Sequence, residues 1–129
     1  MSTEEFEAAA RERLAAAAEH LSTHGWHQGD IYAPGEDDQY PATMKQYDEW
    51  TKTARSCALG AIQACGERSY HLESTAANLL REHLGLGFGR GLGEDGNSMI
   101  FQDPIAVWND DPSRTAEDVI LAMKGAANG

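Results

Sequence analysis

Apolar side chains recur at every third or fourth position near the start of the chain. From about Glu4 to Thr23 they form one stripe, while charged residues such as Arg11, Glu12 and Arg13 occupy the other faces. This is the pattern of an amphipathic helix. The stripe consists of Phe6, Ala10, Leu14, Ala17 and Leu21. We expect the helix to end at His24-Gly25, because a cationic side chain and a glycine both favour a helix C-terminus.

A second helix is predicted from Asp48 or Glu49 to Cys65, ending at Gly66. Its centre has mostly small side chains, which let neighbouring backbones approach closely. We therefore expect it at the centre of the fold. Both cysteines, Cys57 and Cys65, fall in this helix, where a rise of 1.5 Å per residue separates them by about 12 Å, beyond disulfide reach. They are expected to be reduced core residues of a cytoplasmic protein.

Three further helices follow. One spans about 73–84 and ends at Gly85, and a short one begins at Asp103-Pro104, an N-cap followed by the residue favoured at the first helical position. The last begins at Thr115 and fades at Gly125. The fold class is thus mainly α: a single compact domain, residues 1–129, of about four principal helices with a long irregular loop (28–47) and a glycine-rich loop (85–93).

The charge of the chain restricts its partners. Ten basic and 21 acidic side chains give a formal net charge of −11. We expect no direct nucleic-acid binding and no binding to an anionic membrane surface, because both are negatively charged. The charge serves solubility first, and it also fits attraction to a basic partner or mimicry of a nucleic acid. No run of about 20 apolar residues could span a bilayer, and the acidic N-terminus is unlike a secretory signal, so we expect a cytoplasmic protein.

His20, His24 and His27 have the spacing of a metal site. Histidines four positions apart share one face of a helix and can bind zinc. However, Leu21 stands where a zincin has its glutamate, and a helix C-terminus favours histidines without any metal. We therefore predict a structural role for them, with no metal and no cofactor.

The glycine-rich run from Gly85 to Gly93 is not a phosphate-binding loop, because it follows a helix instead of opening one. It is predicted to be a mobile, hairpin-like loop. The alternative is that it docks on a partner through apolar side chains, with a cation able to hold an anion. Its interaction candidates are Phe88, Arg90 and Leu92.

A turn near the end of the chain combines Trp108, Asn109 and Asp110 with Pro112-Ser113. Thr115 and Asp118 then form a shortened capping box for the last helix. This structural explanation accounts for every polar residue in the segment. The alternative makes Asn109 and Asp110 a polar interaction site beside the wall of Trp108.

Three segments carry a family resemblance: Gly25-Trp26-x-Gln28-Gly29, then 57–62, then Trp108-Asn109-Asp110 with Thr115 and Asp118-Val119. Together they resemble a family of small uncharacterised proteins from actinobacteria and their phages. The alanine-rich composition fits a high-GC genome of that kind. The family is a domain of unknown function, so the resemblance implies no reaction and no catalytic residues.

These observations lead to one functional hypothesis and two alternatives. The leading hypothesis is a non-enzymatic accessory or interaction protein, phage-encoded, that binds a host or phage protein. The first alternative is a small hydrolase or metal-dependent enzyme using His20, His24 and His27 or the turn at Asn109 and Asp110. The second is an acidic nucleic-acid mimic.

Overall fold

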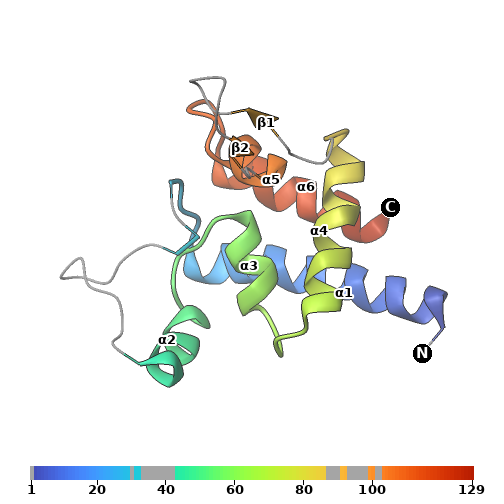
Figure 1. Ribbon diagram of the computed structural model, residues 1–129, viewed down its shortest axis with the longest axis horizontal. Coiled ribbons are helices and arrows are strands. Elements are labelled where there is room, and N and C mark those ends of the chain that lie inside the picture. Colours follow the sequence, from blue (N-terminus) through green and yellow to red (C-terminus); the bar gives the residue numbers. More distant parts are fainter. Residues whose placement is uncertain (1, 30, 33–42, 87–90, 93–98, 101–102) are drawn as a thin grey trace.

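The computed structural model describes residues 2–29, 31–32, 43–86, 91–92, 99–100 and 103–129 (Figure 1). It is mainly helical, as predicted. Two short strands, β1 and β2, pair antiparallel, with Gly91 opposite Ile100. The elements in chain order are α1 (Thr3–His24), α2 (Met44–Thr51), α3 (Ala58–Ala64), α4 (Tyr70–Leu84), β1 (Gly91–Leu92), β2 (Met99–Ile100), α5 (Pro104–Asn109) and α6 (Ala116–Asn128).

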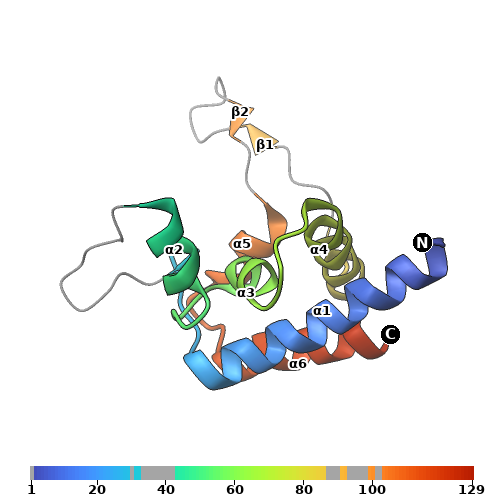
Figure 2. The same cartoon turned by 90° about the horizontal axis from the view of Figure 1, so that it is seen from below.

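The helix α1 forms the centre of the fold. It packs against α3, α4 and α6, and it lies beside α6 so that both chain termini are at the same end (Figure 2). Its predicted apolar stripe is fully buried from Ala10 to Leu21, while Phe6 is half-buried. Because the stripe contains alanines, neighbouring helices can approach closely. The largest buried apolar side chains are Leu14, Leu21, Ile62, Leu80, Ile105, Met123 and Val119.

The predicted helix over 48–65 is wrong, because the chain leaves the helical path between α2 and α3. The intervening backbone bonds instead to the segment after α1: Ser56 N donates to Gly25 O at 3.2 Å, and Cys57 N donates to Ile31 O at 2.9 Å. These bonds compete with helical ones. Cys57 becomes the N-cap of α3 and Cys65 its C-cap, so the two cysteines flank a short helix. Both are free thiols, as expected.

Gly60 explains why α3 tolerates a glycine. A Cβ at this position would lie 2.5 Å from Ile31 O and 2.9 Å from the Cβ of Ser56. The backbone of the segment after α1 therefore crosses α3 at Gly60, in van der Waals contact, and only a residue without a side chain fits there. The helix propensity lost at Gly60, about 1 kcal/mol, is the cost of this crossing.

Two other boundaries differ from the prediction. The helix α4 begins at Tyr70, earlier than expected, because Ser69 caps it: the Ser69 hydroxyl accepts from Leu72 N, and the Glu73 carboxylate accepts from Ser69 N at 2.7 Å. The last helix, α6, continues past Gly125 to Asn128. Among the described residues, no helix is both long and apolar enough to cross a membrane.

The burial of α3 gives a testable expectation. Ile62 is 1% exposed, so Ile62→Ala should lower the free energy of unfolding by about 2–5 kcal/mol. Leu59 is only half-buried on the same helix, so Leu59→Ala should cost less. Urea unfolding of both variants measures this. A loss under about 1 kcal/mol for Ile62→Ala would remove α3 from the core.

Candidate functional site

The three segments that carry the family resemblance meet at one side chain, Asn109. It is fully buried at the C-terminal end of α5. Its Oδ1 accepts from Trp26 Nε1 at 2.7 Å and from Ala58 N at 3.0 Å, and its Nδ2 donates to His27 O at 3.1 Å. Buried amides with all their hydrogen bonds made fix the segments that they join. Asn109 therefore ties the α1 exit and the start of α3 to α5.

Asp110 and Gln28 extend this connection at the surface. The Asp110 Oδ1 accepts from Gly29 N and from Asn109 Nδ2, both at 3.0 Å. The Gln28 amide donates to Asn109 O and to Asp111 O. These contacts give Asn109 and Asp110 structural partners, in line with the structural explanation of this turn.

Trp108 is half-buried and packs against the core. The Arg114 guanidinium carbon lies 4.3 Å from the centre of its ring, and Arg114 Nε donates to Trp108 O. A hydrogen bond from the Ser113 backbone is the main cause that lowers the pKa of the nearby Asp111. The wall predicted at Trp108 is thus covered on one side by a cation from the same turn.

Thr115 and Asp118 form the predicted capping box of α6. The Thr115 hydroxyl accepts from Asp118 N at 3.2 Å, and the Asp118 carboxylate accepts from Thr115 N at 3.0 Å.

Thr115→Ala should lower the free energy of unfolding by about 0.5–2 kcal/mol, because it removes the capping oxygen. Thr115→Ser is the matched control and should change little, since serine keeps that oxygen. Thermal and urea unfolding of the two variants measure the difference. Equal losses in both would mean that the Thr115 methyl group, and not the cap, matters.

The histidines separate into a pair and a single residue. His20 is 6% exposed, and its Nε2 lies 3.2 Å from Ala54 O. Its ring centre is 4.8 Å from that of His24. His27, by contrast, bonds through its backbone to Ser56 and Asn109. Within the described ranges, no three histidine, cysteine or acidic side chains lie close enough together to hold a metal ion.

Burial also dominates the chemistry of the cysteines. It raises the pKa of the Cys57 thiol and of the Cys65 thiol, so neither is an activated nucleophile. Cys57 borders a small hollow of about 180 Å³ beside Asp110. Of the glycine-rich candidates, Phe88 and Arg90 lie outside the described residues, and Leu92 is the last residue of β1.

A larger concave surface lies elsewhere, around the C-terminal end of α3. Two hollows of about 600 and 480 Å³ share Gln63 and Arg68 and together form what we call the α3 groove. Lys45, Asp48, Glu49 and Lys52 line it on the α2 side, and Tyr70, Asn78, Arg81 and Asp103 line it beyond Arg68. Volumes of this size are typical of binding sites.

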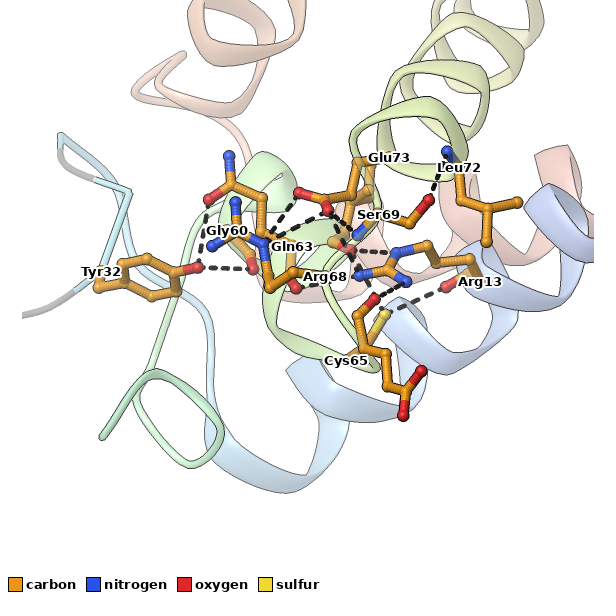
Figure 3. Close-up of polar contacts among 11 residues, drawn as sticks. Arg13, Tyr32, Gly60, Gln63, Cys65, Arg68, Ser69, Leu72 and Glu73 are labelled. Carbon is orange, nitrogen blue, oxygen red and sulfur yellow. Dashed lines mark hydrogen bonds and ion pairs between the residues drawn. The ribbon is translucent and has the colours of Figure 1, made fainter. Parts of the chain in front are cut away.

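Arg13, on α1, bonds to the backbone at the end of α3, which we call the floor of the groove (Figure 3). Its guanidinium donates to Ile62 O and Glu67 O at 2.7 Å and to Gln63 O at 3.0 Å, and it lies 3.9 Å from a Glu73 oxygen. It thus satisfies carbonyls at the end of α3 that the helix itself leaves open.

Arg68 is largely exposed, and its Nε lies 3.2 Å from a carboxylate oxygen of Glu73, with which it forms an ion pair. That hydrogen bond is the main cause that raises the pKa of Arg68. On the α2 side, the Tyr32 hydroxyl donates to Gly60 O at 3.2 Å, and burial raises the pKa of Tyr32. Arg13 and Tyr32 thus connect α3 to two other parts of the chain.

Sequence reasoning missed this groove. It placed Arg13 on a solvent face of α1, which is wrong: the side chain is 8% exposed. A signal existed, because Arg13 directly precedes Leu14 and is four positions before Ala17, at the edge of the apolar stripe. Arg68 and Lys45 carried no local signal, because the groove forms only when α2, α3 and α4 come together.

One family matches the chain. The match covers residues 6–129, and its description is a family of unknown function, DUF6197. The chain belongs to this family. This confirms the resemblance to a family of unknown function. No curated protein and no solved structure matches this DUF6197 chain.

Proposed function

We propose that this DUF6197 protein is a non-enzymatic interaction protein that binds a positively charged protein partner. The observation that carries the proposal is that the polar residues suggested as reactive groups have structural roles. Asn109 and His20 are buried and hydrogen-bonded to distant backbone, and burial raises the pKa of the Cys57 thiol. Groups held in this way support the fold and are poorly placed to react.

The α3 groove is the surface proposed to receive the partner. Tyr70 borders it and is 81% exposed, and Met44, beside the groove residue Lys45, is 75% exposed. Tyrosine and methionine are enriched in protein interfaces, where rigid or adaptable apolar side chains supply contact area. Hydrogen bonds from Arg13 and Tyr32 connect α3 to other parts of the chain, so part of the groove is held in place before the partner binds.

Net charge supports a basic partner instead of a second copy of the chain. At −11, two copies repel each other, while a cationic protein is attracted over distances longer than a contact. Free thiols fit a reducing cytoplasm. We propose that the partner is a host or phage protein in that compartment, and that the gene is of actinobacterial or phage origin.

The test compares two exposed side chains. Tagged wild-type protein, Tyr70→Ala and the control Leu121→Ala are used to capture protein from an actinobacterial lysate. Leu121 lies on α6, away from the groove, and is 58% exposed. We expect one stoichiometric partner with wild type and Leu121→Ala, lost with Tyr70→Ala at an unchanged unfolding midpoint. Equal capture by all three proteins would contradict the groove, and no capture at all would contradict the proposed function.

The charge also favours a second candidate, the acidic nucleic-acid mimic. A mimic occupies the basic site that its partner uses for phosphates, so double-stranded DNA or RNA should release the partner in competition. Binding that nucleic acid leaves unchanged would reject the mimic and keep the interaction protein.

A further inference from the structure

A cluster of titratable side chains outside the groove lies beside the segment that connects α2 to α3. His20 and His24 border a hollow of about 460 Å³, and Glu19, Lys52 and Cys65 border it too. Lys52 also lines the α3 groove. The histidine pair is thus next to the link, residues 52–57, that connects α2 to α3.

This link is fastened to α1 by a few contacts. His20 Nε2 reaches Ala54 O, Ser56 N donates to Gly25 O, and the Arg55 side chain packs over Gly25, where a Cβ would lie 2.7 Å from Arg55 Cγ. Ala54 is itself 8% exposed. The helix α2 directly precedes the link and packs against α3. The position of α2 therefore depends on how the link is held against α1.

We propose that His20 and His24 form a pH-sensitive latch, which holds the link against α1 at neutral pH and releases it under mildly acidic conditions. A neutral His20 fits the buried site and donates to Ala54 O. A protonated ring would still donate, but it would carry a charge in a buried site beside a second imidazole. The titratable groups around the hollow are His24 and Glu19 on α1, Lys52 on the link and Cys65 at the end of α3. Lys52 pairs with Glu49 at 3.0 Å, so Glu19 is the carboxylate left to offset a charge on His20. The charged ring gains water by moving into the hollow, and it then gives up Ala54.

The direction of the effect follows from linkage. Desolvation by burial is the main cause that lowers the pKa of His20; the hydrogen bond to Ala54 O opposes this shift, and His24 adds to it. Above about pH 6.5 the ring is neutral in both the closed and the opened state. Below that pH the opened state takes up the proton first, so closing weakens as the pH falls, by up to tenfold per pH unit for one proton. Because α2 lines the α3 groove, the latch would also regulate the groove, and that last step rests on the proposed function.

The experiment uses the free protein, so its outcome does not depend on any partner. Amide hydrogen exchange of Thr53, Ser56 and Cys57, which donate to backbone carbonyls, is followed from pH 7.5 to 5.5 and corrected for intrinsic rates. We expect their protection to fall by up to tenfold per pH unit, while protection in α4 and α6 is kept. In His20→Gln, which can still donate but does not titrate here, this dependence should vanish, and in the control His71→Gln, exposed on α4, it should remain.

Two results would overturn the latch. One is an unchanged pH dependence in His20→Gln, and the other is an equal loss of protection over the whole chain, which is global acid unfolding. If His20→Gln does not fold, the NMR titration of wild type decides: the His20 ring should titrate at lower pH in the folded protein than in the urea-unfolded protein, and equal midpoints would reject the proposal.

Discussion

Asn109→Ala is expected to lower the free energy of unfolding by about 3–5 kcal/mol. The change leaves the Trp26 indole N–H, the Ala58 N–H and the His27 carbonyl without their buried partner. Each buried polar group that loses its hydrogen bond costs about 1–3 kcal/mol. Urea unfolding monitored by tryptophan fluorescence measures the loss.

Asn78→Ala is the matched control. Asn78 is half-buried on α4, and its Oδ1 accepts one bond, from Arg81. We expect a loss of about 1 kcal/mol or less, which is usual for such a position. If Asn109→Ala cost no more than Asn78→Ala, Asn109 would not hold the three family segments together. A role of Asn109 in binding would then be the better explanation.

Arg13→Ala is expected to be similarly severe, at about 3–5 kcal/mol. It removes the donor to two carbonyls at the end of α3 and to the Glu67 carbonyl in the turn after it. It also leaves Glu73, whose side chain is 12% exposed, with less positive charge nearby. Removing one partner from a buried charged cluster is strongly destabilising because the remaining groups stay buried. Arg13→Lys should recover only part of the loss, since an ammonium cannot span the carbonyls as a planar guanidinium does.

Arg11→Ala on the same helix provides the comparison. The Arg11 side chain is 30% exposed, pairs with Glu7 and donates to Ala126 O. Its loss should cost about 1 kcal/mol or less, as for exposed pairs. Equal costs for Arg11→Ala and Arg13→Ala would show that the floor of the α3 groove is not held by Arg13.

Local signals predicted the starts of α5 and α6 correctly. Thr115 with Asp118, and Asp103 with Pro104, cap their helices through atoms within a few residues, so neighbouring residues contain all the information needed. The break between α2 and α3 had no such signal. It depends on Gly25 and Ile31, which lie far away in sequence and offer backbone partners only after the chain has folded.

The candidate site was less predictable than the fold for the same reason. Asn109 and Trp26 could be recognised as part of a family pattern, but their contact spans 83 positions of the sequence. Arg13 was misplaced because the carbonyls that accept its hydrogen bonds are 49 to 54 positions away in the sequence. The groove itself is built from three helices, and periodicity within each helix says nothing about the surface between them.

The pairing of α1 with α6 has a consequence for how the chain folds as it is made. Arg11 and the Ala126 carbonyl that it binds are 115 positions apart, so one side of the apolar stripe of α1 has no partner until nearly all of the described chain has left the ribosome. Exposed apolar surface on a nascent chain promotes aggregation, and contacts between distant positions slow folding. We expect the α1 stripe to stay open to ribosome-associated chaperones until α6 has emerged and can pack against it.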